Sequence, residues 1–189
     1  FIPCMDKDLA DFSVDYLQKK GAEYVEARLE NNEVTSFVLK DGVPEASSFD
    51  DSSGIGVRFS LKGNIGFVSL NELEKDKIKQ LLDKSFVLTR RSSKIAEKVD
   101  FSESISIHKK CYVNQKKNIH DLGPDEKLDI LTNIDKNLES THKYFHLTDK
   151  LTKKYYVNSE GSQIYSEIPR INFFYFLTIK QDGTLIQRY

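Results

Sequence analysis

Runs in which apolar and polar residues alternate place the strongest constraint on how this sequence can fold. Residues 24–30, 54–61 and 65–70 each alternate in this way. A period of two puts every second side chain on the same face of a β-strand. Strands of this kind bury one face and expose the other, so they need a second layer to cover the apolar face. The sequence therefore predicts a sheet with helices packed on it.

Three segments have the apolar spacing of amphipathic helices. The first runs from Asp6, a residue type that caps helices, to Gly21. The second covers residues 74–88, and the third begins at Gly123-Pro124 and ends near Leu138. The predicted helices are far enough apart in the sequence to pack on different parts of a sheet.

Turn residues and polar pairs divide the predicted strands. We expect breaks at residues 31–32 and 50–53, and turns at residues 41–42 and 62–64. Residues 43–49, which follow the turn at residues 41–42, are then a weak predicted strand. Residues 24–70 are thus predicted to form a meander of about five antiparallel strands.

The predicted fold class is α+β, an antiparallel meander sheet packed by helices, with a second strand-rich portion toward the C-terminus. Residues 89–118 form a polar connection, so we predict one unit over residues 1–100 and a second over residues 101–189. The last residues form a strand just after a turn, and we expect the chain to be cut there rather than finished. Residues 1–4 precede the only methionine, Met5, and are left out of the fold prediction.

Charge and cysteine content exclude several classes of protein. The 28 Lys and Arg residues balance 29 Asp and Glu residues, so a nucleic-acid partner is not expected. Cys4 and Cys111 are too few for a disulfide framework, which favours a reducing, cytoplasmic setting. No apolar run reaches the roughly 18–20 residues of a membrane helix, and the first six residues lack the apolar region of a signal peptide, so neither a membrane span nor export is expected.

Several residues that could carry chemistry lack the partners that the chemistry needs. His142 and His146 would share a helical face as zinc ligands, but no glutamate follows His142, and on a strand the pair would be surface residues. His108 and His120 stand alone, and the Gly54-x-Gly56 pair lacks the rest of a phosphate-binding loop. Cys111 has no histidine placed to act as a base.

Two further segments allow more than one interpretation. The lysine-rich residues 109–117 could contact nucleic acid, although a solvated loop fits the neutral overall charge better. The aromatic residues 173–176 fit either an exposed patch, part of which meets a missing domain or subunit, or a strand buried on both faces.

An ordered set of segments resembles one known family. Residues 21–28 (GAEYVEAR), 39–42 (LKDG) and 54–58 (GIGVR), with Gly66-Phe67, are similar in order and spacing to the opening of TldD/PmbA proteins, also called modulators of DNA gyrase. Near the other end, residues 157–161 (VNSEG) and 181–183 (QDG) resemble the same family. The resemblance covers almost the whole chain, and residues 90–120 match it least.

The resemblance implies a zinc peptidase whose H-E-x-x-x-H helix and later cysteine lie beyond the equivalent of Gly183. This chain contains neither, so no catalytic or metal residue is assigned to it, and zinc is expected only in the missing C-terminal domain. Some family members lack the metal site and pair with members that have it. A homodimer or heterodimer and a peptide or unfolded-protein substrate are therefore implied.

The expected role is that of an N-terminal, non-catalytic domain that forms the wall or substrate entry of a proteolytic chamber. An extended peptide could add to a strand edge there through main-chain hydrogen bonds. The residues expected near a substrate or partner are Arg58 and the turn of Asn158, Ser159, Glu160 and Gly161. The alternative for Arg58 is a surface ion pair, and the alternative for residues 158–161 is an ordinary hairpin turn. The alternative function is a stand-alone protein-interaction module, such as a modulator of DNA gyrase, without hydrolytic activity.

Overall fold

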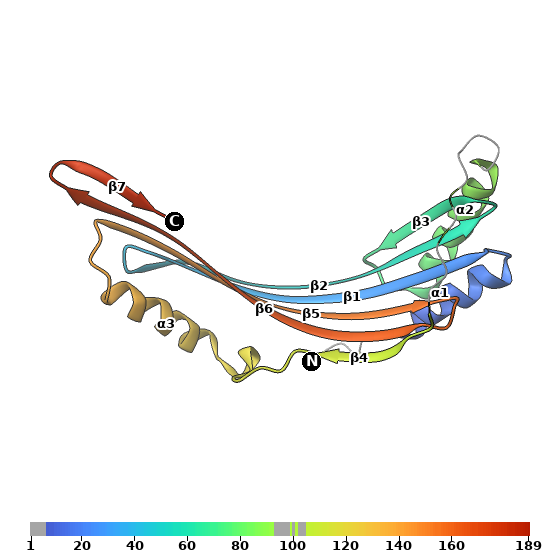
Figure 1. Cartoon of the computed structure of the whole chain (residues 1–189), viewed down its shortest axis with the longest axis horizontal. Helices are drawn as coiled ribbons and strands as arrows, with labels where there is room; N and C mark the ends of the chain where they lie inside the picture. Colours follow the sequence, from blue (N-terminus) through green and yellow to red (C-terminus); the bar gives the residue numbers. More distant parts are fainter. Residues whose placement is uncertain (1–6, 93–98, 100, 102–104) are drawn as a thin grey trace. The chain divides into compact units, whose positions relative to one another are not determined.

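The chain folds into a seven-stranded sheet with helices packed on it. A computed structural model describes residues 7–92, 99, 101 and 105–189, and leaves the predicted cap at Asp6 outside the described residues. The strand order is β3-β2-β1-β5-β6-β4, and β7 pairs with β6 (Figure 1). A single sheet with helices packed on it confirms the predicted α+β class.

Two compact units make up the chain, and each draws on separate stretches of sequence. Unit 1 contains Phe1–Asn31, Ser52–Tyr112 and Thr152–Glu167. Unit 2 contains Asn32–Asp51, Val113–Leu151 and Ile168–Tyr189. The four longest strands contribute residues to both units: β1 (Tyr24–Lys40), β2 (Val43–Leu61), β5 (His142–Asn158) and β6 (Gln163–Gln181).

The break predicted at residues 31–32 is wrong, because β1 continues through both asparagines. Asn31 is a buried residue, and its Nδ2 donates a hydrogen bond to Ser53 Oγ in β2 at 3.0 Å. A polar side chain that finds a partner on the next strand costs little when it is buried. The two asparagines therefore interrupt the apolar alternation without interrupting the strand.

The break predicted at residues 50–53 is also wrong, and β2 is one strand of 19 residues. Residues 43–52 are exposed on both faces of this strand. A strand without a buried face has no reason to alternate apolar and polar residues, so its sequence resembles a loop. Residues 24–70 consequently form three antiparallel strands instead of about five.

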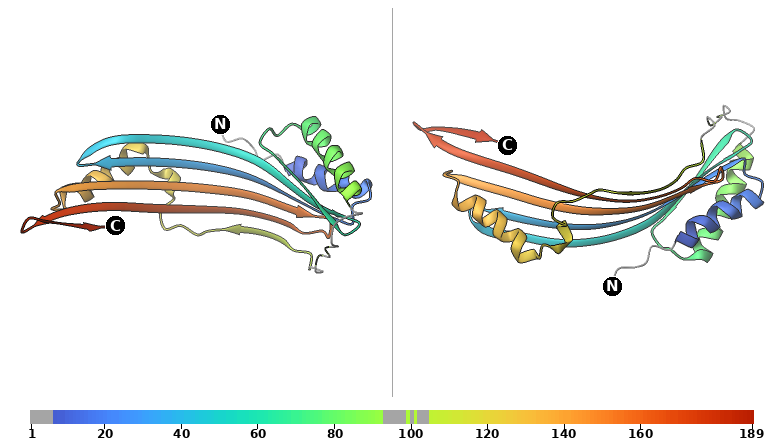
Figure 2. Two further views of the ribbon diagram at one scale, coloured as in Figure 1. Left: turned by 90° about the horizontal axis from the view of Figure 1, so that it is seen from above. Right: turned by 60° about the horizontal axis from the view of Figure 1, so that its bottom comes forward.

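Unit 1 has its core between two helices and one face of the sheet. Helices α1 (Lys7–Lys19) and α2 (Lys75–Ser92) pack on each other, and α2 also packs on β3 (Asn64–Leu70), as the two views of Figure 2 show. Their buried side chains meet every second residue of β1 and β2. The core includes Leu9, Leu17, Val25, Ala27, Val57, Phe59, Ile78, Leu82 and Phe86.

Unit 2 has a smaller core under α3 (Pro124–Lys136). Leu131 of this helix packs on Phe37, Leu39 and Phe145 of the sheet. The helix begins at Pro124 as predicted, and the Glu126 carboxylate accepts a hydrogen bond from the Gly123 N–H at 2.9 Å. This backward contact satisfies a backbone donor at the helix start.

Three hairpins close with the same pair of backbone conformations. Asp41-Gly42, Lys62-Gly63 and Asp182-Gly183 have φ angles of 48° and 78°, 54° and 77°, and 50° and 79°. Positive φ at both central residues defines the type I′ turn, whose twist matches that of the strands it joins. The last of these turns joins β6 to β7 (Thr184–Arg188).

The connection predicted at residues 89–118 contains one short strand. Helix α2 extends into it to Ser92, and β4 (His108–Tyr112) pairs in parallel with residues 163–167 of β6. A 3₁₀ turn follows at Ile119–Asp121. In the sequence, residues 102–107 alternate polar and apolar side chains as a short strand would, and residues 102–104 lie outside the described residues. Among the helices in the described part of the chain, none has the length and apolar character that a membrane span requires.

We expect Gly66→Ala to destabilise unit 1. A Cβ atom at this position would lie 2.2 Å from Phe59 Cζ and 2.6 Å from Thr89 Oγ1, and both of these residues are buried. Overpacking of this kind lowers the free energy of unfolding by about 1–3 kcal/mol. Chemical denaturation measures the loss. Gly56→Ala is the matched control, because its Cβ would meet the Phe67 ring at an ordinary 3.6 Å, and equal losses in the two variants would contradict the packing at Gly66.

Candidate functional site

A cluster of polar and aromatic side chains lies on one face of the sheet in unit 1. Tyr24 and Glu26 come from β1, Arg58 from β2 and Tyr156 from β5. The residues on either side of Glu26 on β1, Val25 and Ala27, belong to the core. Because neighbouring residues on a strand face opposite sides, burial of Val25 and Ala27 under the helices turns Tyr24 and Glu26 to the other face.

The Glu26 carboxylate lies at the centre of this cluster. One oxygen, Oε1, forms an ion pair with Arg58 Nη2 at 2.8 Å. The other, Oε2, accepts hydrogen bonds from the Tyr24 hydroxyl at 2.8 Å and the Tyr156 hydroxyl at 3.1 Å. Both carboxylate oxygens are thus occupied, which fixes the positions of the guanidinium and the two phenols.

Phe101 completes the cluster from the connection after α2. Its ring centroid is 5.0 Å from that of Tyr24, and the Arg58 guanidinium carbon lies 5.2 Å from the Phe101 centroid. A guanidinium over an aromatic face is attracted by the ring quadrupole. Arg58 is therefore held from two directions, by Glu26 and by Phe101, while 45% of its side chain remains exposed.

The two phenols act as hydrogen-bond donors at neutral pH. Burial raises the pKa of Tyr24, and the hydrogen bond with Tyr156 raises it further. Burial is also the main cause that raises the pKa of Tyr156. Both hydroxyls remain protonated near neutrality. Each phenol donates its single proton to Glu26, so the donors that remain for a carbonyl or carboxylate oxygen are the N–H groups of the Arg58 guanidinium.

The turn between β5 and β6 is built around Asn158. Its Oδ1 accepts hydrogen bonds from Ser162 N at 2.8 Å and Glu160 N at 3.2 Å. Gly161 has a φ of +89°, a conformation that glycine adopts without strain. Asn158 itself is buried, and its Nδ2 lies 3.5 Å from the Tyr24 hydroxyl.

Ser159 joins this turn to the start of β1. Its N–H donates to Val25 O at 2.8 Å, and its Oγ accepts from Val25 N at 3.0 Å. These two contacts, one from the backbone of Ser159 and one from its side chain, extend the pairing by one residue beyond the end of β5. These contacts explain why an Asn-Ser-Glu-Gly turn suits this position.

The structure brings two of the predicted residues, Arg58 and Asn158, to one network through Glu26 and Tyr24. Glu160 and Gly161 lie at an exposed turn, and their functional role stays a prediction. Sequence reasoning missed Tyr24, Glu26, Tyr156 and Phe101. The alternation that puts residues 24 and 26, or 156 and 158, on one face was a usable signal, but it does not show that β1 lies beside β5.

The other candidate residues do not come together. His142 and His146 lie on β5, as the strand interpretation predicted, and their spacing of four positions along a strand puts them roughly 13 Å apart. His108 and Cys111 lie on β4, and the side chain of His120 is outside the described part. Within residues 7–92, 99, 101 and 105–189 no group of three His, Cys, Asp or Glu residues is arranged to hold a metal ion.

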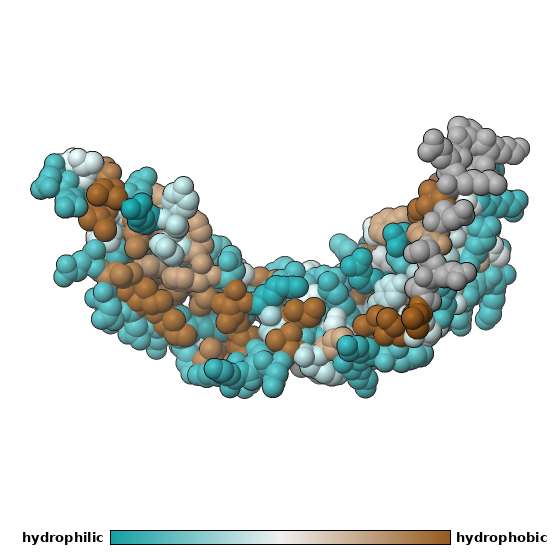
Figure 3. Space-filling model, viewed as in Figure 1, coloured by the Kyte–Doolittle hydropathy of each residue, from teal (hydrophilic) through white to brown (hydrophobic). Residues whose placement is uncertain are grey.

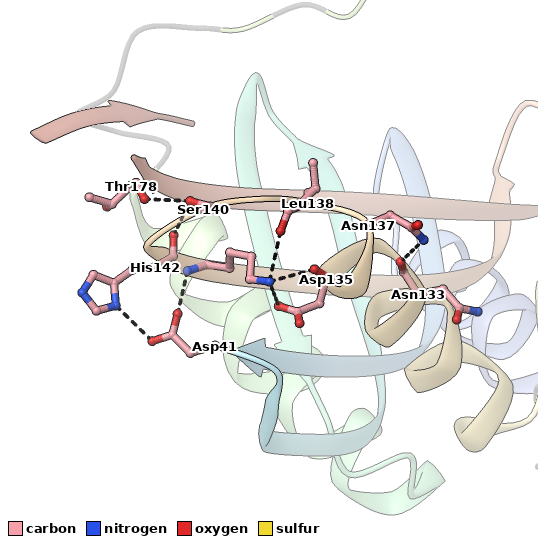
Figure 4. Close-up of polar contacts among 9 residues, drawn as sticks. Asp41, Asn133, Asp135, Asn137, Leu138, Ser140, His142 and Thr178 are labelled. Carbon is pink, nitrogen blue, oxygen red and sulfur yellow. Dashed lines mark hydrogen bonds and ion pairs between the residues drawn. The ribbon is translucent and has the colours of Figure 1, made fainter. Parts of the chain in front are cut away.

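A second polar cluster, in unit 2, has a structural role (Figure 4). Lys143 Nζ lies 2.7 Å from Asp135 O and 3.3 Å from Leu138 O, and its ammonium pairs with Asp135 Oδ1 at 3.1 Å. A cation at the carboxyl end of a helix satisfies its last carbonyl groups and its dipole. Asp41 accepts hydrogen bonds from Lys143 N at 2.7 Å and from His142 Nδ1 at 3.2 Å, and these contacts hold the pKa of Asp41 below its usual value.

Comparison with protein families matches most of the chain to two consecutive domains. Residues 25–88 match the model described as "PmbA/TldA metallopeptidase domain 1", and residues 117–189 match the model described as "PmbA/TldA metallopeptidase central domain". A curated metalloprotease of Methanocaldococcus jannaschii is 28% identical over 171 residues, which cover 86% of this chain and 37% of the relative.

Solved structures share the fold. A protein from Bacteroides thetaiotaomicron, named as a candidate modulator of DNA gyrase, aligns over 99% of this chain and 44% of its own, with a TM-score of 0.76 and 18% identity. TldE from Thermococcus kodakarensis aligns over 95% of this chain and 40% of its own, with a TM-score of 0.64 and 14% identity. The chain thus spans about two-fifths of the length of these relatives.

We expect Asn158→Ala to destabilise the β5–β6 turn. The change removes the acceptor of two backbone N–H groups, one of them on the buried Ser162. A buried donor without a partner costs about 1–3 kcal/mol, which equilibrium denaturation would detect. Asn158→Asp keeps an oxygen in the same place and should lose less. Equal losses in both variants would contradict the role assigned to Oδ1.

Proposed function

This chain belongs to the PmbA/TldD metallopeptidase family, and we propose that it is the N-terminal, non-catalytic part of a metal-dependent peptidase. In that protein it forms the wall or the substrate entry of a proteolytic chamber. The observation that carries the proposal is the pair of family matches, which assign residues 25–88 to domain 1 and residues 117–189 to the central domain.

The residues of this chain do not fit the zinc site that the family implies. None of the four histidines is followed by glutamate, so no H-E-x-x-x-H segment occurs in the sequence. His142 and His146 are held apart on one strand and hydrogen-bond to Asp41 and Ser36, respectively. We therefore assign zinc and the peptide-cleaving residues to a part of the full-length protein outside this sequence.

The Arg58 cluster supplies a reason for this chain to contact substrate. An extended peptide presents carbonyl oxygens at regular intervals, and the cluster presents the N–H groups of a half-exposed guanidinium that Glu26 holds in place. Protonated phenols and a guanidinium do not supply the nucleophile or general base that peptide cleavage needs. The chemistry is that of holding a peptide, with Arg58, Asn158, Ser159, Glu160 and Gly161 as the residues closest to it.

The proposal includes an assembly and a setting. A homodimer or a heterodimer with a related chain would enclose the chamber, and the two cysteines favour the cytoplasm. We also propose a domain boundary near residue 100, since one family match ends at residue 88 and the other begins at residue 117. The alternative is a protein-interaction module without hydrolytic activity, which the Bacteroides thetaiotaomicron neighbour named as a candidate modulator of DNA gyrase favours.

We expect the full-length gene product to hold about one zinc ion per metal-bearing subunit and to hydrolyse an unstructured peptide. Elemental analysis and a fluorogenic peptide assay measure the two properties. A chelator should abolish hydrolysis, and added zinc should restore it. A full-length product that binds no zinc and cleaves no peptide, alone or with a related chain, would favour the interaction module.

We expect Arg58→Ala to lower kcat/KM for peptide hydrolysis by about tenfold or more, because a charge-assisted hydrogen bond contributes about 1.5–3 kcal/mol. The zinc content should not change. Arg91→Ala, at the exposed end of α2, removes the same charge away from the cluster and is the control. Equal kinetics in wild type and Arg58→Ala would remove Arg58 from the substrate path.

A further inference from the structure

An apolar patch of unit 2 and the Arg58 cluster of unit 1 differ in their chemistry. In unit 2, Ile171, Phe173 and Phe174 of β6 are 65%, 40% and 46% exposed, so the aromatic run is an exposed patch and not a strand buried on both faces. Apolar, brown residues gather beside α3 in Figure 3. Residues 171–176 contain no charged residue. The Arg58 cluster exposes a guanidinium, so of these two surfaces it is the one that responds to the charge of a ligand.

Glu26 gives Arg58 a fixed counter-charge. Glu26 Oε1 lies 2.8 Å from Arg58 Nη2, and the side chains of Glu26 and Arg58 are 18% and 45% exposed. The second oxygen of Glu26, Oε2, accepts hydrogen bonds from the Tyr24 and Tyr156 hydroxyls. Because both oxygens are held, the carboxylate stays beside the guanidinium when a ligand approaches.

The ion pair leaves the cluster without net charge. The charges of Arg58 and Glu26 cancel, and burial, which raises the pKa of Tyr24 and of Tyr156, keeps both phenols neutral. The N–H groups of the guanidinium that are not directed at Glu26 remain able to donate. A carbonyl oxygen that accepts such a donor carries no net charge for Glu26 to repel. A carboxylate also accepts the donor, but its charge is repelled by the charge of Glu26 behind the guanidinium.

The neighbouring charges on this face of the sheet do not replace Glu26. Residues at even positions of β1 face the same side as Glu26, and they include Arg28 and Glu30. The Glu30 carboxylate pairs with Lys154 Nζ of β5 at 3.4 Å. Arg28 is exposed, so solvent and salt screen its charge. The charge that a ligand meets at Arg58 is therefore set mainly by Glu26.

Coulomb's law gives the size of the repulsion. A carboxylate on the far side of the guanidinium from Glu26 would lie roughly 6 Å from the Glu26 charge. At that distance, the repulsion between two unit charges weakens binding about threefold at the dielectric constant of water, and about a hundredfold at the value of roughly 20 that is typical near a protein surface. Because Arg58 is half-exposed, we expect a value between these limits, about tenfold.

We propose that Glu26 determines specificity by neutralising Arg58, so that this site accepts the neutral carbonyl oxygens of a peptide and disfavours peptides with a carboxylate at the same place. The peptide as the ligand of Arg58 rests on the proposed function, and the selectivity against carboxylates goes beyond it. Glu26 acts through Arg58 and does not itself touch the peptide, so it is a positioning residue. Without Glu26, the same guanidinium would favour acidic segments.

The test compares hydrolysis of blocked octapeptides by the full-length protein, with one residue, moved along the peptide, as either Glu or Gln. Glu26→Gln keeps an oxygen that accepts from the phenols. At the position that reaches Arg58, it should shift the ratio of KM values about tenfold in favour of the Glu peptide, and the shift should appear in KM and not in kcat. Glu30→Gln removes the same charge from the same face of β1 and should leave the ratio unchanged. Glu26→Asp keeps the charge and should keep the wild-type selectivity.

Binding measurements separate this proposal from the proposed function. Hydrolysis with the same KM ratio in wild type and Glu26→Gln at every position would overturn the role of Glu26 and leave the peptidase assignment intact. If no peptide is cleaved, fluorescence anisotropy of labelled peptides gives the ratio of Kd values in its place. A shift of that ratio in Glu26→Gln, without hydrolysis, would support the role of Glu26 and count against the peptidase. A protein that neither binds nor cleaves any of the peptides would overturn both proposals.

Discussion

The uninterrupted length of four strands is the constraint on which the rest of the structure depends. Along an unbroken strand, the side chains keep strictly to alternate faces, and a slip of one residue would exchange the two faces. Val25 and Ala27 can join the core only if Tyr24 and Glu26 face the other way. The same strand carries Phe37 and Leu39 into the core of unit 2. The hairpin turns and the Asn158 turn hold this register at the strand ends.

The sequence predicts local features well and non-local ones poorly. The helices, the Gly123-Pro124 helix start and the Asp41-Gly42 turn depend on neighbouring residues, so their patterns suffice. The continuity of β1 depends on Ser53, which is distant in the sequence and satisfies Asn31. Strand β2 lacks alternation because its first half has no buried face. Local propensity indicates a break in both places, and pairing overrides it.

The candidate site shows the same division. Resemblance to a family indicated Arg58 and Asn158, but the residues that connect them are Glu26, Tyr24 and Tyr156. These meet because β1 lies between β2 and β5, an order that a single sequence does not reveal. The proposed role of the Arg58 cluster, to hold an extended peptide, depends on this strand order. A single sequence likewise does not reveal that residues 168–176 of β6 pair with neither β4 nor β7. This follows from where β4 ends, at Tyr112, and where β7 begins, at Thr184.

Hydrogen–deuterium exchange of the backbone amides tests strand continuity most directly. If β1 is one strand, the amides of residues 31–32 should be protected to nearly the same extent as those of residues 27–29 and 37–39. The paired residues 163–167 and 177–181 of β6 should likewise be protected. Rapid exchange confined to residues 31–32 would show two strands joined by a turn, and it would contradict the continuous register by which one strand carries Val25 and Phe37 into the two cores.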